Sequence, residues 1–360
     1  MDSSIRAGSP AGHAARRRTL AELFRAVATA TMASAALSAC GGGGGSAAAP
    51  ESPPPPAPTP APAPAPAGPI AAQMTVPTPV GYDADRLAAF NRLNEIRLSA
   101  GLGMLAQSTA MDQAAQAHAQ WIIANDSFSH EEVAGTTGFL AVDWWLRDEV
   151  FGYVPVGGEE LMADSSHGAA GVDVLVNGVY HRAGMLAFEP VDVGIGWSAG
   201  AATHVSTPLV IDMTRPGTDT TRGFGQSAQA SIHGAAIWPI DGARDVPLRL
   251  GAEIPNPVPS QDVLSLGTPV SVTVNEETTI SATAFVLTND ATGAVVPTQV
   301  VSSGHDPNLL VPRSFIALVP LGPLSPNTTY SVTFAGSTVG AVTGAKGSIN
   351  RSWSFTSASQ

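Results

Sequence analysis

The stretch that decides the fold reads FSHEE at 128–132, GYVPVGGEE at 152–160 and NGVYHR at 177–182. Two histidines and one of its four glutamates, His130, His181 and Glu159, stand among many small and apolar residues. Imidazole and carboxylate groups bind divalent metals, and they transfer protons near neutral pH. We therefore expect any chemistry of this chain to lie in this stretch.

The composition predicts a globular protein without a nucleic-acid partner. The chain has 360 residues, of which 44% are hydrophobic and 13% charged, enough for two domains with sizeable cores. Its net charge is −12, and because residues 1–40 carry five arginines against two acidic residues, the remainder carries −15. A protein this acidic lacks the basic surface that nucleic acids require.

The first forty residues predict an export signal with a lipid anchor. Arg16–Arg18 is followed by the uncharged apolar run 26–39, which is too short to span a bilayer. The sequence LSAC at 37–40 resembles the bacterial lipobox, in which the cysteine becomes lipidated. Because Cys40 is the only cysteine, we favour this interpretation over an ordinary signal peptide. We therefore expect membrane attachment through Cys40 in a bacterial cell envelope. In a Gram-negative cell the expected site is the outer membrane, since Gly41 is not an inner-membrane retention signal.

Residues 41–79 predict a linker. Gly41–Gly45 is a flexible glycine run, and the Pro and Ala-Pro repeats of 50–69 favour a stiff polyproline II rod. A proline-rich ligand for a partner protein is the alternative, but no basic or aromatic residue accompanies the prolines. With Cys40 as the sole cysteine, the folded part has no disulfide, cysteine-zinc site or thiol nucleophile.

Residues 80–222 predict an α+β domain. Apolar residues at helical spacing predict one helix from residue 83 to Gly101 and a second from Ser108. His118 falls on the apolar face of the second helix, so we interpret it as a core histidine. We expect a further helix at 140–148 and another helix, or the end of one, at 173–180. Strands are expected at 191–197 and 208–213, and a long loop over 149–170. Helices first and strands later are typical of a layered α+β fold.

Several short motifs, in this order, resemble the CAP superfamily, also called the SCP or cysteine-rich secretory protein family. They are LNEIRLSAGL at 93–102, AAQAHA at 114–119, FSH at 128–130, GY at 152–153 with GE at 158–159, HR at 181–182 and GIG at 194–196. The resemblance implies an α-β-α sandwich whose cavity is lined by two His and two Glu.

By position, the resemblance implies that His130, Glu159 and His181 line this cavity. The second glutamate of the family would fall near Gly178, where this sequence has no carboxylate. Glu160, which stands where the family usually has Asn, and Asp173 are candidates to replace it.

Three functions are compatible with the His130, Glu159 and His181 set. The one we favour is a non-enzymatic module that binds a lipid or cell-wall ligand in this cleft, as the resemblance implies. Zn²⁺ held by the two histidines would instead support a metal-dependent hydrolase of peptides or cell-wall polymers. Metal-free acid-base chemistry is a further route. In the third function, a structural or adhesive surface protein, the cleft is vestigial.

The neighbours of these residues are expected to have structural roles. Arg182 is predicted to pair with a carboxylate. Glu131 and Glu132 are predicted to form a solvated face of the loop. Ser198 has Gly-x-Ser-x-Gly surroundings, in GWSAG at 196–200, but the next predicted element is a strand, not the helix that follows a hydrolase nucleophile.

Residues 233–358 predict an all-β sandwich that resembles bacterial immunoglobulin-like domains. Val270, Val272 and Val274 alternate with polar residues, and turn residues follow at short intervals. The segment 324–330 resembles a tyrosine corner, in which the Tyr330 hydroxyl reaches back to the preceding turn. We find no catalytic constellation here and expect a spacer or adhesion module.

Overall fold

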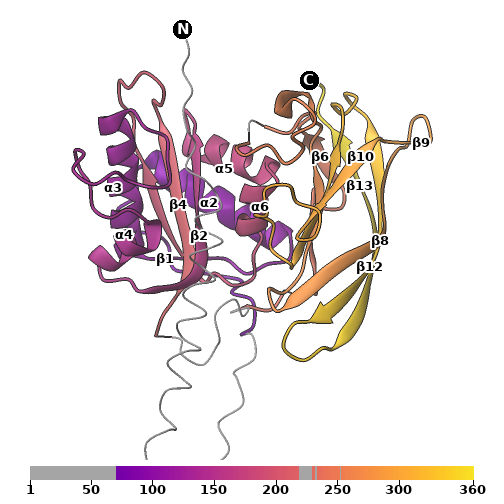
Figure 1. Cartoon of the computed structure of the whole chain (residues 1–360), viewed down its shortest axis with the longest axis horizontal. Helices are drawn as coiled ribbons and strands as arrows, with labels where there is room; N and C mark the ends of the chain where they lie inside the picture. Colours follow the sequence, from indigo (N-terminus) through magenta and orange to yellow (C-terminus); the bar gives the residue numbers. More distant parts are fainter. Residues whose placement is uncertain (1–69, 219–228, 232, 252) are drawn as a thin grey trace, which may run out of the picture. The chain divides into compact units, whose positions relative to one another are not determined.

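The computed structural model describes residues 70–218, 229–231, 233–251 and 253–360 (Figure 1). The export signal, Cys40 and the proline repeats lie outside these residues. Within them, none of the helices combines the length and the apolar character needed to cross a membrane.

A four-stranded sheet forms the centre of the first domain. Its strand order is β1 (Ala106–Gln107), β3 (Asp192–Trp197), β4 (Pro208–Pro216) and β2 (Pro155–Asp164). Only the β1–β3 pair is parallel. The helices of this domain are α2 (Ala84–Ser99), α3 (Thr109–Asn125), α4 (Trp144–Val150), α5 (Gly168–Asn177) and α6 (Tyr180–Met185).

Helices cover both faces of this sheet. Side chains alternate between the two faces along each strand, so both faces carry apolar residues for the helices to bury. On one face, Leu161 and Ile211 join a core with apolar residues of α2 and α5. On the other, Met162 and Val210 pack against α3. The predicted α-β-α sandwich and the α+β class are confirmed.

The first two helices begin where their capping residues predict, and the first ends at Ser99, shortly before the predicted Gly101. Asp83 caps α2 by accepting a hydrogen bond from the Arg86 amide, and Ser108 caps α3 through the Met111 amide. The later boundaries differ from the predicted ones. The helix expected at 140–148 is α4, and the one expected at 173–180 is the C-terminal part of α5 followed by α6.

The prediction of a loop over 149–170 is wrong, because the edge strand β2 occupies Pro155–Asp164. Its register against β4 shifts between Val156 and Glu159, where Gly157 and Gly158 adopt φ of 68° and 95°. At Gly158 a Cβ would collide with the carbonyl oxygen of Met213. This glycine bulge interrupts the alternation that would otherwise have indicated a strand.

The second domain consists of two mainly antiparallel sheets. One has the order β10 (Thr298–Ser302), β11 (Phe315–Pro320), β7 (Val270–Thr273) and β5 (Ala236–Trp238). The other has the order β6 (Ala243–Val246), β13 (Lys346–Ser357), β12 (Thr329–Gly340), β8 (Thr278–Asn289) and β9 (Ala294–Val295). A short 3-10 helix, η1 (Val263–Ser265), precedes β7.

Apolar residues from both sheets form one core, as in a sandwich. Val272 of β7 and Leu318 of β11 belong to the same buried cluster as Phe334 of β12. The Ser325 amide donates a hydrogen bond to the Tyr330 hydroxyl at 2.7 Å, which is the predicted tyrosine corner. This β-rich arrangement is consistent with the immunoglobulin-like resemblance.

The sheet that contains β11 is buried on both faces. Its second face carries Phe315, Ala317 and Val319, which share a buried cluster with Val179 and Ala183 around α6. This double burial explains why β11 reads as a continuous apolar run rather than an alternating one. Helix α6 therefore has the β-rich domain as a direct packing partner.

Candidate functional site

His130 is tied to a buried carboxylate by one of its two ring nitrogens. It follows α3, and its Nδ1 lies 2.8 Å from Oε2 of Glu160 on β2. Burial by itself would raise the pKa of Glu160, but the charges of Arg147 and His118 and the hydrogen bond from His130 lower it to about 2. An ionised carboxylate only accepts hydrogen bonds, so Nδ1 donates, and in the neutral ring Nε2 keeps its lone pair. The side chain of His130 is 48% exposed, against 1% for Glu160.

Arg147 fixes the loop that carries His130. This arginine of α4 donates to Oε1 of Glu160 at 2.5 Å, to the carbonyl of His130 at 3.1 Å and to the carbonyl of Val142 at 3.0 Å. The arginine is almost fully buried. One guanidinium thus joins α4, β2 and both ends of the loop.

His118 is a core histidine, as predicted. Its Nδ1 lies 2.9 Å from Oε1 of Glu132, its Nε2 lies 3.0 Å from the carbonyl of Ser129, and its ring stacks on Trp121. The prediction that Glu132 belongs to a solvated face is wrong. Glu132 is 2% exposed, and it accepts a further hydrogen bond from the Leu140 amide at 2.7 Å. Only Glu131 of this pair is exposed.

Two further aspartates are buried beside this cluster. Asp212 on β4 is directly opposite Glu160 in the sheet register, and Asp148 follows Arg147 on α4. Neither oxygen of the Asp148 carboxyl has a hydrogen-bond partner within the described parts of the chain. Burial and the charge of Glu160 raise the pKa of Asp148 to about 8, and burial also raises the pKa of Asp212. Asp148 is therefore held in its neutral form near pH 7.

Glu159 faces the opposite side of the sheet from Glu160, because successive residues of a strand point to opposite faces. Its carboxylate packs directly against Gly184 in α6. His181 lies on the same short helix. Glu159 therefore lies on the side of the domain that carries His181, whereas Glu160 is hydrogen-bonded to His130.

His181 pairs with a carboxylate from the second domain. Its Nδ1 lies 3.2 Å from Oε1 of Glu253, and the side chains of the two residues are 21% and 2% exposed. Glu253 also accepts hydrogen bonds from the amides of Val179 and Tyr180, at 2.7 and 2.8 Å. Sequence reasoning missed Glu253, which is 72 positions from His181 and lies in no recognised motif.

The prediction that Arg182 pairs with a carboxylate is wrong. Its hydrogen bonds go to the carbonyl oxygens of Val176 at 2.6 Å and Pro269 of the second domain at 2.7 Å, and to the Ser271 hydroxyl at 3.5 Å. The side chain is fully buried, and this burial lowers its pKa to about 9. Arg182 therefore joins α5, α6 and the second domain by bonding their backbone.

The predicted set is thus divided between two histidine-carboxylate pairs, His130 with Glu160 and His181 with Glu253. Of the two candidate replacements for the second glutamate, Glu160 belongs to the His130 pair. Asp173 binds Arg92 at 2.7 Å on the surface. In the residues that the structure describes, no three His, Cys, Asp or Glu side chains are grouped so that they could hold a metal ion. The Zn²⁺ prediction for His130 and His181 stays a prediction that this arrangement does not support.

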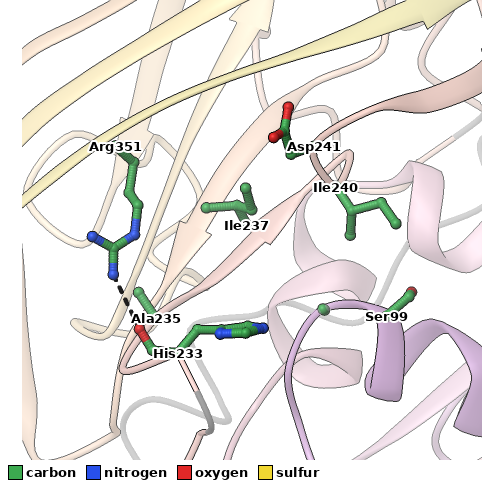
Figure 2. A pocket seen from close by; sticks show the side chains of 8 residues that line it. Ser99, His233, Ala235, Ile237, Ile240, Asp241 and Arg351 are labelled. Carbon is green, nitrogen blue, oxygen red and sulfur yellow. Dashed lines mark hydrogen bonds between the residues drawn. The ribbon is translucent and has the colours of Figure 1, made fainter.

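A pocket of about 250 Å³ lies elsewhere, between the C-terminal end of α2 and the second domain (Figure 2). Its apolar lining is Ala100, Ala235, Ile237 and Ile240. Its polar lining is Ser99, His233, Asp241 and Arg351. Arg351 donates to the carbonyl of His233 at 3.0 Å. None of the predicted site residues lines this pocket.

The first domain is thus an α-β-α sandwich with two histidine-carboxylate pairs beside its sheet. Residues 90–204 match the model of the CAP family, described as the cysteine-rich secretory protein family. The chain therefore contains a CAP domain.

Among solved structures, the chain is similar to an extracellular protein containing a SCP domain from Bacillus anthracis str. Ames. The two are 20% identical with a TM-score of 0.30, over 36% of this chain and 40% of that one. No curated protein matches the chain.

Proposed function

We propose that the CAP domain is a ligand-binding module whose polar contacts are the Nε2 atoms of His130 and His181. The observation that carries this proposal is the shared arrangement of the two rings. In each, Nδ1 faces a buried carboxylate, while the side chain remains partly exposed, at 48% and 21%. A histidine fixed in this way offers one defined atom to a ligand and loses little freedom on binding.

Glu159 is part of the same proposal, on the His181 side of the sheet. The ligand class we propose is a lipid or a cell-wall component. The support is the sequence: an export signal and a lipidated Cys40 would keep the domain in the cell envelope, beside such molecules. The net charge argues against a nucleic acid.

The test is to purify the intact chain and to identify any bound apolar ligand by solvent extraction and mass spectrometry. His130→Ala and His181→Ala should each lose the ligand with little change in Tm. His204→Ala is the matched control, since His204 also pairs with an aspartate, Asp126 at 2.7 Å, but is 70% exposed at another place. A folded wild-type protein without ligand, or ligand retained in both variants, would contradict the proposal.

A metal-dependent hydrolase is the second candidate, because a carboxylate on Nδ1 also orients histidines that bind metals or act as general bases. Calorimetric titration of the same proteins with Zn²⁺ distinguishes it. Tight one-to-one binding that both alanine variants lose would favour the hydrolase. We expect no such binding. A purely structural or adhesive protein would show neither Zn²⁺ nor bound ligand.

A further inference from the structure

Glu253 is a residue of the second domain that is bonded almost entirely to the first. It lies between β6 and η1, and its carboxylate accepts from the amides of Val179, Tyr180 and His181 at 2.7, 2.8 and 3.3 Å. It thereby caps the start of α6, which otherwise has no side-chain cap of its own. At 2% exposure this carboxylate is withdrawn from solvent by the contact.

The fourth donor to this carboxylate is the His181 ring. Oε1 already receives two backbone N–H groups, so it can meet Nδ1 of His181 at 3.2 Å only as an acceptor. The neutral imidazole is therefore held with its proton on Nδ1. Its Nε2 is left as the acceptor atom on a side chain that is 21% exposed.

The first domain leaves room for this carboxylate. Gly178 is the residue after α5, and a Cβ built there would lie 2.5 Å from Oε1 of Glu253. Real Cβ atoms do not approach an oxygen so closely. The position near which the CAP resemblance implies a second glutamate is thus a glycine, and a carboxylate from the other domain fills the space beside it.

We propose that Glu253 is a positioning residue of the His181 site, which the second domain supplies to the CAP domain. Its carboxylate selects the Nδ1–H tautomer of His181 and so makes Nε2 the atom presented to a ligand. The importance of Nε2 rests on the proposed binding function, but the tautomer itself can be measured without any ligand.

The test is NMR of the intact chain with ¹⁵N-labelled histidine rings, at a pH where the rings are neutral. Loss of signals in His181→Ala assigns His181. We expect the wild type to show the Nδ1–H tautomer and Glu253→Ala to shift toward Nε2–H. Glu253→Gln should retain the wild-type tautomer, because its amide oxygen can still accept from Nδ1.

Tyr180→Phe is the matched control for a weakened domain contact. The Tyr180 hydroxyl bonds Asp306 and Asn308 of the second domain, each at 2.7 Å, without touching His181. This variant should lower Tm and leave the tautomer unchanged. An Nε2–H tautomer in the wild type, or an unchanged Nδ1–H tautomer in Glu253→Ala, would overturn the proposal. Failure to find a ligand would overturn the binding function alone.

Discussion

Nδ1 of His130 lies 2.8 Å from the carboxylate of Glu160, the residue that follows the glutamate indicated by the family pattern. The reason is the pleat of β2, which directs Glu160 toward α4 and Glu159 toward α6. The bulge at Gly157 and Gly158 determines which of the two glutamates faces each side of the sheet, because it shifts the register before Glu159. The choice of carboxylate for His130 is therefore a property of the strand.

Removal of the Glu160 side chain should strongly destabilise the fold. Glu160→Ala would leave the buried guanidinium of Arg147 without its closest carboxylate, and breaking such a buried pair costs about 3–5 kcal/mol. Urea denaturation measures the change in the free energy of unfolding. The matched control is Glu131→Ala at the exposed position of the same loop, which should stay within about 0.5 kcal/mol of wild type. Equal effects of the two substitutions would contradict this role of Glu160.

Asp148 should make stability fall as the pH rises. Its pKa is about 8 in the folded protein and near 3.8 in the unfolded chain, so the folded state binds the extra proton. Its contribution is complete below pH 4 and is lost progressively up to pH 8. The slope is at most about 1.4 kcal/mol per pH unit.

Asp148→Asn removes this proton linkage and keeps the shape of the side chain. Relative to this variant, the wild type should become steadily less stable between pH 5 and pH 8 in urea denaturation. The effects of all other titrating groups cancel in this difference to a first approximation. Parallel stability curves for the two proteins would show that Asp148 is ionised in the fold.

Gly178→Ala should displace Glu253 from its place beside α6. The backbone of Gly178 is extended, with φ of −76°, so alanine fits the backbone. The main clash of its Cβ is with the carboxylate at 2.5 Å, and the Leu175 carbonyl oxygen lies at 3.3 Å. Overpacking of this kind costs about 1–3 kcal/mol, and the His181 tautomer should shift as well. Gly304→Ala, at a glycine with open space around it, serves as control. A Gly178→Ala protein with wild-type Tm and tautomer would show that Glu253 is not confined there.

The tyrosine corner should stabilise the second domain through a single hydrogen bond. Tyr330→Phe keeps the buried ring and removes the acceptor of the Ser325 amide, at a cost of about 1–3 kcal/mol. Thermal unfolding should therefore show a lower Tm. An unchanged Tm would mean that water replaces the hydroxyl.

The sequence predicted those elements whose pattern is local. Capping residues and apolar spacing locate α2 and α3, and alternation locates β3. The same spacing placed His118 in the core. Glycine hid β2, since the bulge at Gly157 and Gly158 breaks the alternation on which strand prediction depends.

The site was less predictable because its carboxylates come from distant segments. Glu132 resembles its exposed neighbour Glu131 in sequence, and only the fold turns it toward His118. Glu253 has no local signal, and its role depends on packing between segments 72 positions apart. Arg182 was expected to need a negative partner, yet its shortest hydrogen bonds go to backbone carbonyls.

The apolar contact of α6 with β11 limits how recombination can separate the two domains of this chain. A breakpoint between the two domains would separate Val179 from Phe315 and leave both surfaces open to water. It would also leave His181 without Glu253. Recombination that moves the CAP segment without the β-rich segment should therefore expose apolar surface at Val179, and a relative that carries the CAP segment alone should have a polar residue there.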